Sequence, residues 1–335
     1  MKLISSEAIS ENLIELLEET ELGTNGARYV HLDTRNRIKD VDNPISYSLV
    51  RNETLIANIT FCRRPVGYYL RYFAFAKAFQ NNSANKPKRK STSSPFENKI
   101  EEAFRELTKR QPDLPMYAYI DYENDRSRLF SERFGFFPYT DIVSRTYSRT
   151  RPKKHLKAEF LNDWQKLKDI VGVEYSNNEF YQTSHIHKGP YVVVKDKEGI
   201  VVSFAKFTKV HWKIKRLPGR LGAFFVRAIP YVPVLNKILR PNDHSFLVPD
   251  IVYTRNKSQE EIESLFDSAL SLYNVNSLIW FVDPNQEVYS KCKNKINWGL
   301  LDKILGEKKV ALVCRNQSSS YVESRPVFVS AFDLI

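Results

Sequence analysis

Cysteine is scarce in this sequence, and long apolar runs are lacking. The three cysteines among 335 residues, Cys62, Cys292 and Cys314, lie far apart without C-x-x-C spacing. This pattern argues against a disulfide framework and a zinc site, and it favours a reducing compartment. No uncharged stretch reaches the roughly 18 residues that a membrane-spanning helix needs. The segment 2–19 is an acidic amphipathic sequence without the apolar core of a signal peptide. We therefore expect a cytoplasmic protein.

Negative charge is also in short supply. The chain has 39 acidic and 51 basic residues, a net charge of +12. Such a charge predicts attraction to an anionic partner, which leaves open nucleotide phosphates, an anionic membrane or a nucleic acid such as tRNA. With 42% hydrophobic residues the chain can bury a full core, and its length favours two domains. We expect an N-terminal domain of residues 1–150 and a C-terminal domain of residues 151–335, with the basic segment 151–154 as linker.

One long segment has no acidic residue at all. Between Gly199 and Asn242 there is no Asp or Glu, whereas nine residues are Lys or Arg and bulky apolar side chains lie between them. Prolines at 230 and 233 exclude one straight helix. We interpret residues 208–245 as an insertion. It is a candidate for contact with a membrane interface, for the wall of an acyl-acceptor pocket, or for a lid packed on its own domain.

The two halves repeat one order of elements. Each half has an apolar strand, a capping box that opens a helix, a second strand with an acidic turn, and a helix that ends at glycine. The first copy comprises residues 70–76, 94–97, 116–120 and a helix to Gly135; the second comprises residues 246–253, 258–261, 278–282 and a helix to Gly299. Further predicted elements are a strand over 68–79, helices over 6–19, 156–171 and 288–305, and strands over 309–315 and 327–334. The repeat predicts a duplicated α/β unit with two equivalent clefts.

The segment 124–136, NDRSRLFSERFGF, is the most specific local motif. It resembles the N-x-x-(A/S)-x-x-(L/F)-Y-x-x-x-G-F segment of the GNAT superfamily of N-acetyltransferases, and the element order of each half is also similar to that family. The resemblance implies an α/β protein of two tandem GNAT-like domains, each a mixed, mostly antiparallel sheet flanked by helices. It further implies acyl-CoA-dependent transfer of an acetyl or longer acyl group to an amine acceptor.

The resemblance also implies site residues. Coenzyme A would lie in the first copy near Ala78, Gln80, Lys88, Arg89, Asn124 and Ser127, and in the second copy near Thr254, Arg255, Lys257 and Ser258. Transfer to an amine needs a base for the ammonium proton and an acid for the leaving thiolate. Asp250 is the candidate base, and Tyr253 or Tyr289 the candidate acid. No metal is expected, because the pair His185 and His187 has no Cys, Asp or Glu at ligand spacing.

Two alternatives remain open at this point. Neither half has the glycine-rich loop with which the family binds pyrophosphate. A Fem-type aminoacyl transferase, which uses aminoacyl-tRNA, suits that absence and the positive charge. A catalytically inactive binding or scaffold protein that kept the fold suits the absence as well.

Overall fold

The computed structural model describes residues 1–23, 26–80, 95–315 and 325–335. The strands of the first half are β1 (Lys2–Ser6), β2 (Arg28–His31), β3 (Pro44–Arg51), β4 (Thr54–Arg64), β5 (Gly67–Leu70), β6 (Ala74–Phe75), β7 (Met116–Asp121) and β8 (Phe137–Ser148). Its helices are α1 (Glu11–Glu19), α2 (Thr34–Ile38), α3 (Lys77–Gln80), α4 (Pro95–Arg110) and α5 (Asp125–Arg133).

The second half repeats the arrangement with added elements. Its strands are β9 (Ala158–Leu161), β10 (Tyr191–Lys195), β11 (Val201–Arg216), β12 (His244–Thr254), β13 (Ser277–Val282) and β14 (Lys308–Arg315). Its helices are α6 (Gln165–Tyr175), α7 (Gly222–Ala228), the 3-10 helix η1 (Ile229–Tyr231), α8 (Pro233–Ile238), α9 (Gln259–Leu272), α10 (Glu287–Cys292), α11 (Leu300–Leu305) and α12 (Ala331–Leu334).

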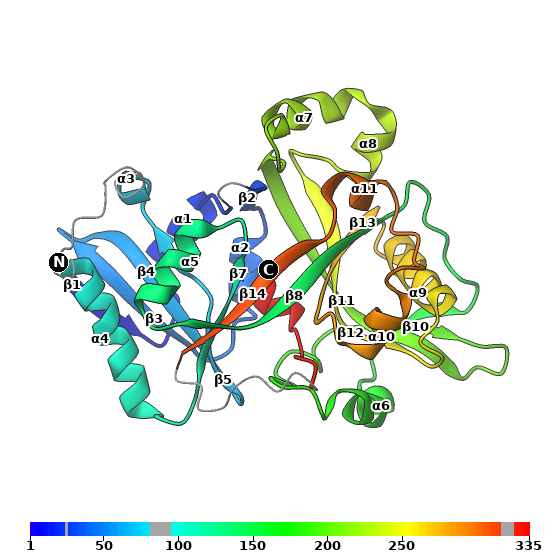
Figure 1. The fold of residues 1–335 in the computed structure, drawn as a ribbon, viewed down its shortest axis with the longest axis horizontal. Coiled ribbons are helices and arrows are strands. Elements are labelled where there is room, and N and C mark those ends of the chain that lie inside the picture. Colours follow the sequence, from blue (N-terminus) through cyan, green and yellow to red (C-terminus); the bar gives the residue numbers. More distant parts are fainter. Residues whose placement is uncertain (24–25, 81–94, 316–324) are drawn as a thin grey trace.

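The strands of both halves join into one continuous sheet (Figure 1). Its order is β1-β3-β4-β5-β7-β14-β8-β13-β12-β11-β10-β9, with β2 paired to β11 and β6 to β4. The halves exchange their last strands: β14 pairs with β7 of the first half, and β8 pairs with β13 of the second. The mixed, mostly antiparallel character that the sequence predicted is confirmed, whereas the exchange was not foreseen. The division at residue 150 stays a prediction.

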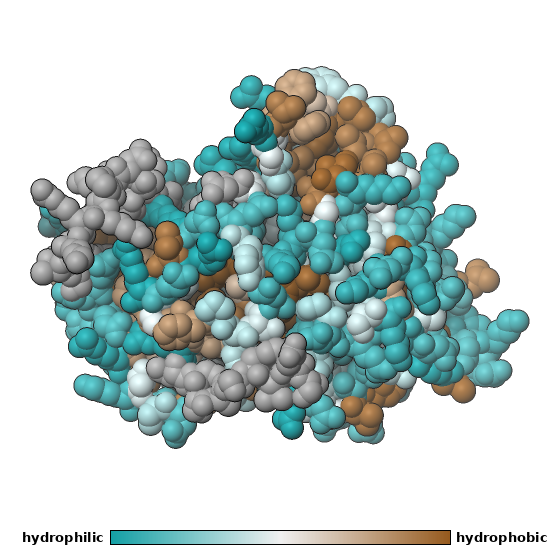
Figure 2. Space-filling view, viewed as in Figure 1, coloured by the Kyte–Doolittle hydropathy of each residue, from teal (hydrophilic) through white to brown (hydrophobic). Residues whose placement is uncertain are grey.

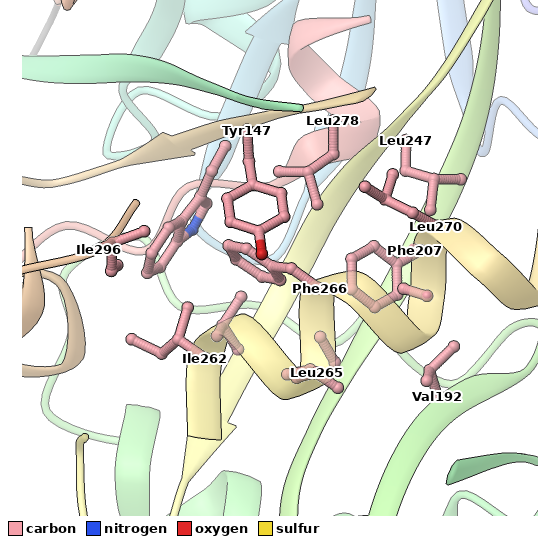
Figure 3. Close-up of a cluster of buried hydrophobic side chains, with 14 of the residues drawn as sticks. Tyr147, Val192, Phe207, Leu247, Ile262, Leu265, Phe266, Leu270, Leu278 and Ile296 are labelled. Carbon is pink, nitrogen blue, oxygen red and sulfur yellow. The ribbon is translucent and has the colours of Figure 1, made fainter. Parts of the chain in front are cut away.

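One amphipathic helix packs on the sheet in each half. The stripe of α4, comprising Ile100, Ala103, Phe104 and Leu107, is fully buried. In the second half α9 buries Ile262, Leu265, Phe266 and Leu270 against Val192, Phe207, Leu247, Leu278 and Tyr147 of the sheet (Figure 3). Neighbouring residues of a strand point to opposite faces, so Val193 of β10 contributes instead to the cluster with α6.

Several predicted elements differ in the structure. The strand expected over 68–79 is interrupted after Leu70, residues 158–161 form β9 ahead of α6, and β1 precedes the first helix. The helix expected over 288–305 is split into α10 and α11. Gly299 at the break has φ +91°, and a Cβ there would lie 2.2 Å from the Ser148 carbonyl oxygen. The first nine residues of the insertion expected over 208–245 continue β11.

Candidate functional site

Strands β5 and β7 separate after a very short contact. They pair in parallel only at Tyr68 with Met116 and at Tyr69 with Tyr117. Beyond these pairs β7 continues to Asp121, whereas the segment that follows β5 bends back toward β4. The sheet therefore opens into a wedge beside the start of α5.

A β-bulge marks the edge of this wedge. Three residues lie between Leu70 and Ala74, but only two lie between their partners on β4, Phe61 and Asn58. The extra residue leaves the ladder incomplete. The Arg71 N–H bonds to the Thr60 carbonyl at 2.8 Å. No described residue accepts a hydrogen bond from the N–H of Tyr72 or Phe73, so two backbone donors are free at this point.

A cavity of about 330 Å³ fills the wedge. Its wall is mostly apolar and aromatic. The side chains come from β5, β7, α1, α4, α5 and the segments that follow β5 and α5, and they include Tyr69, Tyr72, Phe73, Phe104, Ala118, Tyr119, Phe130, Phe134 and Phe136. Asn124 and Ser127 also line it. The Asn124 side chain caps α5 by accepting the Ser127 N–H at 3.1 Å. Two residues predicted from the motif therefore lie on the cavity wall.

The segment 327–335 closes the cavity from the second half. Asp333, Leu334 and Ile335 lie on its wall. Arg64 donates to Asp333 at 2.7 Å, and Arg71 donates to the carbonyl oxygens of Phe332 and Ile335. The sequence predicted a strand over 327–334, which is wrong: Val327 makes a single bridge to Glu179, residues 328–330 are neither helix nor strand, and Ala331–Leu334 form the short helix α12. Arg64 and Arg71 of the first half therefore fix this segment through hydrogen bonds, whereas pairing with a neighbouring strand does not.

Polar groups gather at one part of the cavity wall. Burial lowers the pKa of His31 to about 4, although a hydrogen bond to Asp33 acts in the opposite direction and raises it. The imidazole is therefore neutral near pH 7. Burial and the nearby Arg71 lower the pKa of Arg37 to about 10, so this guanidinium remains charged. Burial likewise raises the pKa of Tyr29 to about 12. The cations that line the cavity are Arg37 and Arg71, and its carboxylates are Asp121 and Asp333. The Asp33 carboxylate lies 3.8 Å from Arg37.

The fold has a clear match among solved structures. The N-myristoyltransferase of Saccharomyces cerevisiae with bound myristoyl-CoA is similar with a TM-score of 0.58 and 11% sequence identity, over 95% of this chain and 83% of that chain. A structure of the same yeast enzyme with myristoyl-CoA and inhibitors gives a TM-score of 0.56 at 10% identity, over 99% and 84% of the two chains. The chain has the duplicated GNAT fold. No family model and no curated protein matches the sequence.

The second wedge of this GNAT fold is packed with side chains. Strands β12 and β13 pair in parallel only at Leu247 with Leu278, so the splay is repeated. Here, however, Tyr289 of α10 packs against Trp280 and Trp298, with ring centroids 5.5 and 6.3 Å apart. Neither cavity described for the structure lies in this wedge.

The three predicted catalytic residues are not brought together. Asp250 is buried, accepts the Ala331 N–H at 3.3 Å and has a pKa raised to about 6 by burial, which the charge of Lys206 opposes. Tyr253 stacks on Phe204 at 4.9 Å. Tyr289 lies in the α9 core and donates to Glu307 at 2.8 Å, and burial raises its pKa. None of the three lines either described cavity, so their catalytic role stays a prediction.

The predicted phosphate contacts of the second half are occupied within the protein. Arg255 pairs with Asp196 at 3.2 Å, and Lys257 pairs with Glu174 at 3.3 Å and with Glu287. Ser258 caps α9, as predicted, by accepting the Glu261 N–H at 3.3 Å. Thr254 is buried at the end of β12.

The remaining predicted residues belong to the first half. Ala78 and Gln80 lie on α3. Lys88, Arg89 and the capping residue Ser94 lie outside the described residues. The bulge at Tyr72 and Phe73 was not predicted, because a run of aromatic residues is typical of one continuous strand. His31 and Arg37 were not predicted either, because no motif or spacing in the nearby sequence indicates that they lie in the cleft.

In the described part of the chain, every helix is too short or too polar to cross a bilayer. The same residues contain no group of three or more His, Cys, Asp or Glu side chains that would hold a metal ion. All three cysteines are buried free thiols.

Proposed function

We propose that this chain is an acyl-CoA-dependent N-acyltransferase that binds its acyl donor in the first-half cavity. The observation that carries the proposal is that Tyr72 and Phe73, whose N–H groups have no acceptor among the described residues, line an apolar wedge. Attack of an amine on a thioester places negative charge on the carbonyl oxygen. Preorganised backbone donors in a site with little water stabilise that charge strongly.

The cavity favours an acyl group longer than acetyl. Its volume falls at the lower end of the range for ligand sites, and aromatic and aliphatic side chains dominate its wall. An acetyl group has three heavy atoms and would leave most of that apolar surface in contact with water. The similar yeast structures hold myristoyl-CoA, which supports a fatty acyl donor here.

The first half also contains groups that can accept a proton. His31 is neutral near pH 7, and Asp121 is a carboxylate on the same wall. Either is a candidate for removing the proton of the attacking ammonium group. No residue is assigned to protonate the leaving thiolate, because Phe130 occupies the position at which the family motif has tyrosine.

The test is thiol release with acyl-CoA donors from two to sixteen carbons and a panel of amines. We expect turnover with at least one long-chain donor, and at least a tenfold lower kcat/KM with acetyl-CoA. Calorimetry showing no heat with any donor would favour the inactive scaffold protein. Tight, salt-dependent binding of aminoacyl-tRNA without CoA binding would favour the Fem-type transferase.

A further inference from the structure

Residues 217–240 form a finger that projects from the end of β11 (Figure 1). Its inner face is buried against α11, where Leu217, Ile229, Ile238 and Leu239 pack with Leu301. Gly222 fixes the turn at its base, because a Cβ there would lie 1.8 Å from the Leu217 carbonyl oxygen. The finger is therefore a folded element with its own small core.

The outer face of the finger is apolar and exposed. Figure 2 shows a continuous hydrophobic patch over α7 and α8. The side chains that make it are Leu221 (62% exposed), Phe224 (64%), Phe225 (48%), Tyr231 (86%), Val232 (41%) and Val234 (52%). A contiguous patch of this kind marks an interaction surface, whereas single exposed apolar residues need no explanation.

Five exposed cations lie in the finger or next to it in the sequence. Lys215, Arg220, Arg227, Lys237 and Arg240 are all exposed. Within the described ranges, none of them has a carboxylate within 4 Å, and the segment from Gly199 to Asn242 contains no acidic residue. The partner of this surface must accept apolar side chains and carry negative charge.

We propose that the finger docks on the surface of a lipid bilayer that contains anionic lipid. Short helices with an aromatic face and basic flanks lie in the interface, where apolar rings enter the acyl boundary and Lys and Arg reach the headgroups. RNA supplies phosphates but no apolar medium for Leu221, Val232 and Val234. A second copy would bring the same cations face to face, which opposes association.

The experiment is sedimentation of the full chain with vesicles of phosphatidylcholine alone or with 30% phosphatidylserine. We expect binding to the anionic vesicles only, weakened by salt. Each basic residue near such a surface contributes about fivefold in affinity. The Arg220→Glu/Arg227→Glu variant should therefore bind at least tenfold more weakly. Phe224→Ser/Phe225→Ser should lose at least tenfold while its melting temperature stays unchanged, because both side chains are exposed.

Matched controls separate docking from general attraction of a basic protein. Lys154→Glu/Lys197→Glu makes the same charge change away from the finger, and Phe137→Ser/Leu156→Ser removes two exposed apolar groups elsewhere. Both should bind vesicles like the wild type. Equal losses in the control and finger variants would overturn the proposal. So would finger variants that retain vesicle binding but lose tRNA binding or self-association measured by sedimentation velocity.

Discussion

Arg64 and Asp333 form an ion pair of 2.7 Å between side chains that are 0% and 1% exposed, across 269 residues of sequence. The pair joins β4 of the first half to the helix that closes the cavity. Its formation therefore depends on the two halves folding together, and it fixes residues on the cavity wall.

We predict that Arg64→Met or Asp333→Asn alone lowers the free energy of unfolding by about 3–5 kcal/mol, because each change leaves a buried polar or charged partner unpaired. Urea unfolding of both single variants and the double variant measures this. The double variant should lose less than the sum of the single losses. Additive losses, or single losses below about 1 kcal/mol, would contradict the role given to the pair.

Stability should fall in acid partly through His244. Burial lowers the pKa of His244 to about 4, and its ring stacks on Phe246. The unfolded chain takes up this proton near pH 6.5, so the native state loses stability as the pH falls from about 6.5 to about 4. Between pH 7.5 and 5 the loss from this group is about 2 kcal/mol.

Urea unfolding of the wild type and His244→Gln at both pH values tests this assignment. The glutamine variant should show a pH-dependent loss smaller by about that amount. An identical pH-dependent loss in the two proteins would mean that His244 is not the responsible group.

The backbone N–H of Phe73, which has no acceptor among the described residues, can be tested without altering a side chain. Nonsense suppression with phenyllactic acid replaces this N–H by an ester oxygen. If the amide stabilises the oxyanion, kcat should fall by about 10²–10³. The same replacement at Phe224, in the first turn of α7, should leave kcat unchanged, because helix-initial N–H groups have no partner within the helix. Equal effects at both positions would remove Phe73 from the mechanism.

Local patterns in the sequence predicted the elements that local forces determine. The buried stripe of α4 and the Ser258 cap of α9 follow from helical periodicity and capping chemistry, and the motif placed Asn124 and Ser127 on the cavity wall. The closing segment was misread, since nothing near Asp333 indicates Arg64. The exchange of β8 and β14 is likewise a long-range pairing, and the bulge at Phe73 depends on register rather than residue type.

The repeat predicted two equivalent clefts, and the catalytic residues were predicted in the second copy, whereas the cavity lies in the first. Both copies splay their core strands, but rings around Tyr289 fill the second wedge while the first encloses a cavity. A repeated backbone does not specify which copy remains open, because side-chain volume decides it.

The central claim is that the first-half cavity holds the acyl donor, and calorimetric titration with myristoyl-CoA tests it most directly. Ser127→Phe fills the cavity while keeping the backbone N–H that Asn124 accepts. Tyr289→Phe serves as the control in the second wedge, where it removes the hydroxyl that donates to Glu307. We predict binding by the wild type and Tyr289→Phe, and at least tenfold weaker binding by Ser127→Phe at unchanged melting temperature. Undiminished binding by Ser127→Phe, or loss only in Tyr289→Phe, would contradict the account.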